Sequence, residues 1–267
     1  MSGPLDLPVS GGRGFGLSPS FIDALAEHRP EPIRSQPATG PQSGTPLSIP
    51  HGTTIIGLKF SGGVIMAGDR RSTEGFSIAD EKIEKVFQAD DYSAVSIAGA
   101  AGQATEIVRL FQTELEHYEK VEGERLSLEG KANRLAQMIR SNFPMALQGL
   151  VVVPLFGGYD ERRGEGRLFR YDATGGRWEE EDFMSTGSGG RPARSTLKKR
   201  WHAGLAREEA MRVAVEALRD ASEEDVATGG PDPVRGLWPS VKLITSAGVE
   251  EVENEEVRAA YESLVSG

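Results

Sequence analysis

The distribution of proline and glycine divides this chain at residue 52, and that division limits which part can fold. Residues 1–52 contain nine of the 15 prolines and eight of the 33 glycines, so one or the other occupies 17 of 52 positions. A segment of this composition buries too little apolar surface to offset the entropy lost on ordering. From Thr53 onward, two apolar runs flank Ser61-Gly62-Gly63 and predict a pair of strands joined by a tight turn. We therefore predict a flexible leader over 1–52 and one folded domain over 53–267.

The predicted elements of the folded part fall into alternating groups of strands and helices. A short strand over 92–98 precedes two amphipathic helices. Their apolar stripes are Ala104, Ile107, Val108, Phe111, Leu115 and Tyr118, then Ala132, Leu135, Ala136, Ile139 and Phe143. The later predicted elements are strands at 150–155 and 167–171, a helix at 211–221, a strand at 241–245 and a helix at 255–264. This order is typical of sheets covered by helical layers.

Charge and composition exclude several classes of function. With 30 Lys and Arg against 40 Asp and Glu, the net charge is −10, which argues against a nucleic-acid partner because phosphate binding requires a basic face. The chain has no cysteine, so disulfides, thiolate catalysis and Cys-ligated zinc are excluded. The longest apolar run, 150–156, is too short to span a membrane, and the N-terminus lacks the features of a signal peptide. We expect a cytoplasmic protein with no membrane partner.

The familiar catalytic motifs are missing. Outside the leader the histidines are His117 and His202, and neither has the partner four residues away that a zinc-binding helix requires. The glycines around Ser188 match neither a nucleophile elbow nor a phosphate-binding loop. We predict that an enzyme with this sequence uses a base other than histidine and needs neither a metal nor a cofactor.

The Gly52-Thr53 junction offers a different kind of catalyst. Cutting after Gly52 would make Thr53 the N-terminal residue of the first strand, with a hydroxyl nucleophile and an α-amine whose unperturbed pKa is about 7.7–8.0. The nucleophile would then carry its own base. Before the cut that nitrogen is an amide, so the leader would keep the enzyme inactive. A glycine at 52 would also permit the tight backbone conformation that lets Thr53 attack the preceding carbonyl.

Five motifs, in order and at matching spacing, give this chain a likeness to a known family. They lie at 52–57, 67–73, 82–86, 97–99 and 225–230. Together they resemble the successive signatures of a proteasome β-subunit, and segments 117–120 and 227–232 resemble the actinobacterial type in particular. The resemblance covers 53–267. It implies a four-layer αββα sandwich, an α/β (α+β) fold of the N-terminal-nucleophile hydrolase class, and a threonine endopeptidase that matures by autocatalytic cleavage between Gly52 and Thr53.

The resemblance also implies roles for individual residues. Thr53 is the nucleophile, and Lys85 favours its deprotonated hydroxyl and holds the α-amine nearer neutrality. Asp69 pairs with Lys85, and Gly99 presents its backbone N–H to the oxyanion of the tetrahedral intermediate. Apart from the motif, Lys85 alone is more typical of a solvated lysine.

Three further positions complete the catalytic set that the resemblance implies. Ser188, Asp225 and Thr228 hydrogen-bond the α-amine of Thr53 and relay its proton. Many members of the family carry serine where this chain has Thr228, and the hydroxyl is retained. As local structure, segment 225–230 is also typical of a helix exit with a glycine C-cap.

The residues that match the family's substrate pocket predict its preference. By resemblance, the pocket for the residue before the cut and the adjoining backbone pairing involve Ser72, Thr73, Ile83, Phe87, Ile97, Ala101 and Thr105. Three of these, Ile83, Ile97 and Ala101, form an apolar wall. We therefore predict faster cleavage after bulky apolar or aromatic residues than after charged ones.

The family's assembly supplies the expected partners. Heptameric rings of β-subunits lie between rings of α-subunits, and the helices over 103–143 contribute to contacts between rings. Resemblance to the actinobacterial type implies an ATPase ring that delivers unfolded, Pup-tagged polypeptides. Two alternatives remain open at this point: a simpler ATP-dependent threonine peptidase without α-rings, and a catalytically silent assembly subunit.

Overall fold

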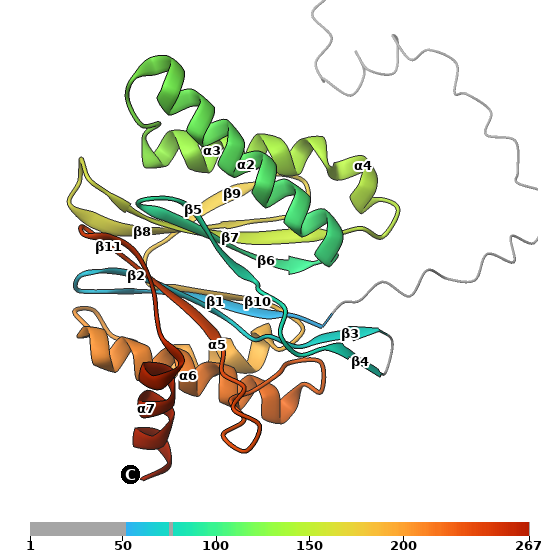
Figure 1. The fold of residues 1–267 in the computed structure, drawn as a ribbon, viewed down its shortest axis with the longest axis vertical. Helices are drawn as coiled ribbons and strands as arrows, with labels where there is room; N and C mark the ends of the chain where they lie inside the picture. The colour runs from blue at the N-terminus through green and yellow to red at the C-terminus, as the bar shows by residue number, and fades with distance from the viewer. Residues whose placement is uncertain (1–51, 75–76, 267) are drawn as a thin grey trace, which may run out of the picture. The chain divides into compact units, whose positions relative to one another are not determined.

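The computed structural model describes residues 52–74 and 77–266. Residues 1–51 lie outside that range, so the interpretation of this segment as a leader stays a prediction. In the described part, two five-stranded antiparallel sheets pack face to face, and helices cover the outer face of each (Figure 1). The predicted four-layer αββα sandwich is confirmed.

The first sheet contains the start of the folded domain. Its order is β10-β1-β2-β11-β12, and its strands are β1 (Thr54–Phe60), β2 (Gly63–Gly68), β10 (Phe183–Gly187), β11 (Ser240–Thr245) and β12 (Gly248–Glu251). Phe60 pairs with Gly63, which confirms the tight turn between the first two strands. The helices on its outer side are α5 (Gly190–Arg200), α6 (Arg207–Glu224) and α7 (Asn254–Val265), and their apolar residues share one core with this sheet.

The second sheet has the order β5-β6-β7-β8-β9. Its strands are β5 (Val86–Asp90), β6 (Ser93–Gly99), β7 (Val152–Asp160), β8 (Glu165–Tyr171) and β9 (Arg177–Glu180). The helices α2 (Ala101–Glu122) and α3 (Leu128–Ser141) cover it with the predicted stripes, except at their ends. Tyr118 is only half-buried, and the placement of Phe143 in the α3 stripe is wrong. Because α3 stops at Ser141, Phe143 instead begins α4 (Phe143–Ala146), where it is 36% exposed.

A third core lies between the two sheets and fixes the start of β1. Its buried members are Ile55, Val64, Met66, Val86, Ala94, Ala98, Leu155, Leu168 and Ile244. Ile55 faces this inner core, whereas Ile56 and Leu58 face the helices, so β1 is buried on both sides. Burial on both faces restricts the strand more than one-sided packing would. The residue that precedes β1, Thr53, is therefore attached to one of the best-packed strands of the domain.

A small hairpin projects beside this end of the sandwich. It consists of β3 (Ser72–Glu74) and β4 (Ser77–Asp80), which pair with a register shift between Ser72 and Thr73. The exposed β4 has no apolar pattern that would have identified it from sequence. Among the described helices, none combines the length and apolarity needed to cross a membrane.

Candidate active site

Thr53 lies immediately before β1 with its hydroxyl directed at the preceding carbonyl. Its side chain is buried, and Oγ1 donates a hydrogen bond to the carbonyl oxygen of Gly52 at 2.7 Å. Its own carbonyl accepts the backbone N–H of Ser188 at 2.9 Å, and its nitrogen lies 3.4 Å from Ser188 Oγ. The Gly52–Thr53 bond is intact in this chain, so that nitrogen is an amide. The hydroxyl and the bond predicted to be cut are in contact.

Gly52 occupies a space that admits no side chain. A Cβ at this position would lie 2.5 Å from Thr73 Oγ1 and 2.8 Å from the carbonyl oxygen of Ala227. Crowding by Thr73 and Ala227 is therefore a reason for glycine at this site.

Lys85 lies beside the same carbonyl and is buried, so its interpretation as a solvated lysine is wrong. Its Nζ is 2.7 Å from Asp69 Oδ1 and 3.3 Å from the Gly52 oxygen, and it also donates to the carbonyl of Arg71. Burial lowers the pKa of Lys85 below its ordinary value, although the carboxylate of Asp69 partly opposes that shift. Nζ donates all three of its hydrogen bonds to oxygen acceptors, as an ammonium does, so a cation lies beside the Gly52 carbonyl.

Asp69 is held by backbone donors as well as by Lys85. Its Oδ1 accepts the N–H of Thr54 at 2.7 Å, and its Oδ2 accepts those of Arg71 and Gly229, each at 2.9 Å. These donors stabilise the ionised carboxylate in a fully buried position. The predicted Asp69–Lys85 pair is thus present, and it is fixed from three segments of the chain.

Asp225 and Thr228 form a second polar pair, which contacts Thr54, the residue after Thr53. Thr228 Oγ1 donates to Asp225 Oδ2 at 2.6 Å, and the N–H of Ala227 donates to Oδ1 at 3.2 Å. Burial alone would raise the pKa of Asp225, but hydrogen bonds from Ser188 and Thr228 outweigh it and hold the pKa below its ordinary value. Asp225 is therefore ionised at neutral pH.

The segment that carries Asp225 does not end its helix as the sequence suggested. The glycine C-cap interpretation is wrong, because α6 ends at Glu224 and Asp225 itself is the C-cap, in an extended conformation. Neither Gly229 nor Gly230 has a positive φ. An extended residue at 225 turns the chain away from the helix axis and toward Thr53.

Gly99 closes β6 in a conformation that requires glycine. Its φ is 122°, and a Cβ there would lie 2.1 Å from the carbonyl oxygen of Val151. The position therefore demands glycine for backbone reasons alone. Its predicted role as an oxyanion donor remains a prediction, since the reaction's oxyanion is not part of this structure.

A pocket opens beside Thr53 and contains six of the seven predicted substrate residues. They are Ser72, Ile83, Phe87, Ile97, Ala101 and Thr105. Thr73 is not in this wall and instead lies against Gly52. Glu84, Lys85 and Ala104 also line the pocket, and of these Glu84 and Ala104 were not predicted to do so.

One residue of the site was missed altogether. Thr54 is fully buried, and its hydroxyl contacts Thr228 Oγ1 at 2.6 Å and the N–H of Gly189 at 2.9 Å. Thr228 therefore points at Thr54 in this structure rather than at the nitrogen of Thr53. Of the described residues, no group of three His, Asp or Glu side chains is arranged to hold a metal ion.

Comparison with known proteins identifies the family. The family model described as "Proteasome subunit" matches residues 49–234. This chain belongs to the proteasome subunit family. A proteasome subunit beta of Acidimicrobium ferrooxidans is 55% identical over 235 residues, which cover 87% of this chain and 86% of the relative. Those of Streptomyces griseus and Jonesia denitrificans are 53% and 50% identical, over 93% and 97% of this chain and 88% and 87% of their own lengths.

Family membership fixes the general activity. Proteasome β subunits are hydrolases of the threonine endopeptidase class, and this chain is a core peptidase of that type. As a β subunit it assembles with α and β subunits in the core particle.

Proposed function

We propose that this chain is the precursor of a proteasome β subunit in which residues 1–52 are a propeptide and Thr53 becomes the nucleophile once the Gly52–Thr53 bond is cut. The observation that carries the proposal is the contact of Thr53 Oγ1 with the Gly52 oxygen at 2.7 Å, with Lys85 Nζ 3.3 Å from that oxygen. The attacking hydroxyl, a cation and the carbonyl under attack are thus neighbours within one buried site.

Thr53, Gly52 and Lys85 supply the groups needed for the cleavage. Thr53 Oγ1 adds to the carbonyl carbon of Gly52, and the hydroxyl proton passes to the Thr53 nitrogen as the C–N bond breaks. An ester then joins Gly52 to Thr53 Oγ1, and water hydrolyses it. The products are a leader ending in the Gly52 carboxylate and a chain beginning with the free α-amine of Thr53. Lys85, as a cation, stabilises negative charge that develops on the Gly52 oxygen.

The mature site would use the same hydroxyl on a substrate peptide. The α-amine accepts the proton of Thr53 Oγ1 and returns it to the leaving amine, and water then releases the acyl group. Gly99 donates its N–H to the oxyanion, and Ser188, Asp225 and Thr228 hold the α-amine. The pocket lined by Ile83, Ile97 and Ala101 receives the side chain that precedes the cut.

The finer points of assembly are also part of the proposal. We expect heptameric rings with α-subunits in the cytoplasm, and an ATPase ring that delivers unfolded, Pup-tagged polypeptides. Support comes from the relatives, which are named as β subunits and come from actinobacteria. The same names favour a proteasome over a peptidase without α-rings, and co-purification with an α-subunit tests that alternative. The presence of Thr53, Lys85 and Gly52 together favours an active over a silent subunit.

The decisive experiment measures intact mass after co-expression with the α-subunit. Wild-type chain in the assembled particle should lose residues 1–52, Thr53→Ala should keep them, and Thr53→Ser, which retains a hydroxyl, should be processed. Hydrolysis of a peptide substrate should follow the same order. A wild-type particle that keeps its full-length chain would refute the proposed mechanism and favour the silent subunit.

A further inference from the structure

Thr54 is a buried residue that contacts both polar groups around Thr53. Its N–H donates to Asp69 Oδ1 at 2.7 Å, and the same oxygen holds Lys85 Nζ at 2.7 Å. Its hydroxyl lies 2.9 Å from the N–H of Gly189 and 2.6 Å from Thr228 Oγ1. Thr54 therefore connects the Asp69–Lys85 pair to the Asp225–Thr228 pair.

The direction of these hydrogen bonds follows from counting protons. An ionised carboxylate only accepts, and a threonine hydroxyl has one proton to donate. Because Thr228 gives its proton to Asp225 Oδ2, the bond between the two threonines must use the proton of Thr54. The hydrogen bonds therefore form a series in which the N–H of Gly189 donates to Thr54, Thr54 donates to Thr228, and Thr228 donates to Asp225.

The packing around the two hydroxyls is close. A Cβ on Gly189 would lie 2.6 Å from Thr228 Oγ1 and 2.7 Å from Thr54 Oγ1, so the glycine leaves space for both hydroxyls and for nothing larger. Thr54 and Thr228 are both fully buried. One lone pair of Thr228 Oγ1 accepts the hydrogen bond from Thr54. Its other lone pair can therefore accept a hydrogen bond from only a narrow range of directions.

We propose that Thr54 is a positioning residue, which orients the Thr228 hydroxyl and the Asp69 carboxylate about Thr53 without touching the substrate. This inference rests on the proposed function of Thr53. Removing the Thr54 hydroxyl leaves the Thr228 hydroxyl held by Asp225 alone, so the group that holds the α-amine loses one of the two hydrogen bonds that fix its direction. Catalysis should suffer, whereas the substrate pocket, which Thr54 does not line, should be unaffected.

The test compares Thr54→Val with Thr54→Ser in the assembled, processed particle. Valine has nearly the shape of threonine but no hydroxyl, and serine keeps the hydroxyl. For Thr54→Val we expect kcat for a peptide substrate to fall about tenfold or more with KM within about twofold of wild type. Thr54→Ser should restore kcat to within about threefold of wild type.

A matched control separates positioning from a general loss of stability. Thr196 on α5 is also buried and donates to Asp220 at 2.6 Å, and that bond involves no residue assigned to the site. Thr196→Val removes a threonine–aspartate hydrogen bond that is as long as the Thr54–Thr228 bond, and the kcat of this variant should equal that of wild type. Thr54→Ala is made in parallel. If Thr54→Val does not assemble, the kcat of Thr54→Ala takes its place.

A double-mutant cycle identifies the route of the effect. If Thr54 acts through Thr228, Thr228→Val should lower kcat and adding Thr54→Val should lower it little further. Additive losses, a wild-type kcat for Thr54→Val, or an equal loss in Thr196→Val would each overturn the inference. Such results alongside an inactive Thr53→Ala would leave the proposed function standing, whereas an active Thr53→Ala would refute the proposed function itself.

Discussion

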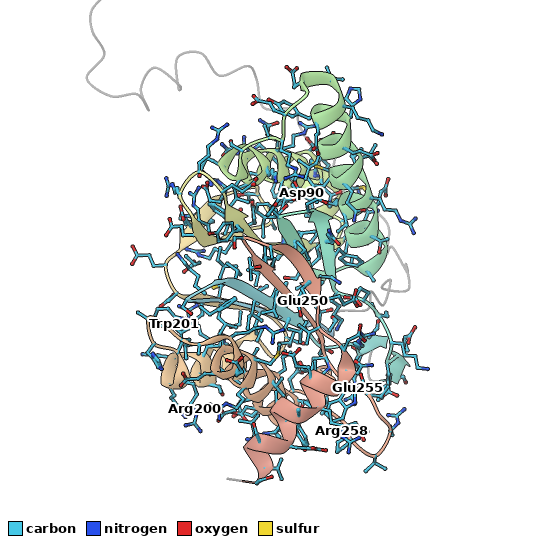
Figure 2. The ribbon with its side chains drawn as sticks, turned by 60° about the vertical axis from the view of Figure 1, so that its left-hand side comes forward. Asp90, Arg200, Trp201, Glu250, Glu255 and Arg258 are labelled. Atoms are coloured by element: carbon cyan, nitrogen blue, oxygen red, sulfur yellow. The ribbon has the colours of Figure 1, made fainter. Side chains whose placement is uncertain are left out.

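Two buried clusters of charge in this molecule have similar parts and different surroundings. Around Thr53, Lys85 is 4% exposed and lies 2.7 Å from Asp69. At the second sheet, Lys131 of α3 is also 4% exposed and lies 2.5 Å from Asp90, which Figure 2 labels beside the green helices. Lys85 additionally touches the Gly52 carbonyl and lines a pocket, whereas Lys131 does not line that pocket. A buried lysine–aspartate pair is thus not a catalytic signal by itself; what distinguishes the two is the contact with the carbonyl that we propose is attacked.

The charged side chains bonded to α3, which we call the α3 cluster, also include an arginine with several acidic partners. Arg167 on β8 is 2% exposed and bonds Asp160 at 3.0 Å, Glu129 at 2.7 Å and Glu179 at 2.5 Å. These bonds join α3 to β7, β8 and β9. Since the partners compensate the charge of Arg167 within the cluster, we assign the α3 cluster to stability and the Thr53 cluster to chemistry.

The largest expected difference between the two clusters is the loss of activity when Lys85 is replaced. In Lys85→Met, leader removal and peptide hydrolysis should fall by roughly 10²–10⁴-fold, because the hydroxyl of Thr53 loses its charged neighbour. The fold should persist, since Asp69 retains three backbone N–H donors. Intact mass and peptide hydrolysis measure the effect. Processing of Lys85→Met at the wild-type rate would remove the distinction between the clusters.

The corresponding change in the α3 cluster should act on stability alone. Lys131→Met leaves the carboxylate of Asp90 with donors from Tyr92 and Ser93 but no cation, and breaking a buried pair in this way costs roughly 3 kcal/mol. Denaturant unfolding of the chain should show this loss. Peptide hydrolysis per assembled site should match wild type, and a loss comparable to that of Lys85→Met would contradict the comparison.

The pocket beside Lys85 gives a third prediction. Because Ile83, Ile97 and Ala101 line it, peptides cut after Tyr or Leu should have kcat/KM values about tenfold or more above those cut after Arg or Asp. A series of peptides differing at that single position measures the preference. Faster cleavage after Arg or Asp would assign a dominant role to Glu84 or Lys85 in the same wall.

The smallest expected effect is the pH dependence of the stability that Asp160 contributes in the α3 cluster. Burial alone would raise the pKa of Asp160, but hydrogen bonds from Arg167 and from the backbone of Arg163 and Arg162 hold it below its ordinary value. A lowered pKa in the folded state stabilises the fold above the ordinary value of about 3.9, and that contribution is lost as pH falls through the folded pKa. Asp160→Asn should therefore cost about 1 kcal/mol at pH 7 and progressively less below pH of about 4.

Urea unfolding of wild type and Asp160→Asn at several pH values measures this effect. Asp91 serves as the control, because it pairs with Arg125 at the surface, where an ion pair contributes little to stability. Asp91→Asn should change the unfolding free energy by at most about 0.5 kcal/mol at any pH. A constant difference between wild type and Asp160→Asn across the range would show that Asp160 does not titrate with folding.

Sequence patterns identified the parts of the fold whose periodicity is long and apolar. The stripes of α2 and α6 and the strands flanking Ser61-Gly62-Gly63 were predicted within a few residues. Helix α5 was missed because its sequence buries few apolar side chains, chiefly Ala193 and Leu197, and ends in Lys198-Lys199-Arg200. Strands β9, β10 and β12 were missed because each is four or five residues long, too short for alternation to be distinctive.

The residues of the site likewise fall into those that the sequence predicted and one, Thr54, that it did not. Thr53, Asp69 and Lys85 lie in motifs that resemble those of a known family, and that resemblance, rather than their spacing alone, implied their grouping. Thr54 acquires its partners only on folding, because Gly189 is 135 residues away and Thr228 is 174 residues away. Neither composition nor local pattern indicates that two threonine hydroxyls will meet there.

The clamp on the carbonyl of Thr53 has a consequence for the timing of activation. Ser188 donates its N–H to that oxygen at 2.9 Å, and Gly187, with φ 100°, approaches so closely that a Cβ would lie 1.8 Å from it. Thr53 is thus anchored through its carboxyl side, while the leader departs from its amino side. We expect departure to leave the residue where it is, so that activation waits on one covalent step and on no rearrangement of the domain. A particle that closes before that step then holds its sites fully assembled and inactive.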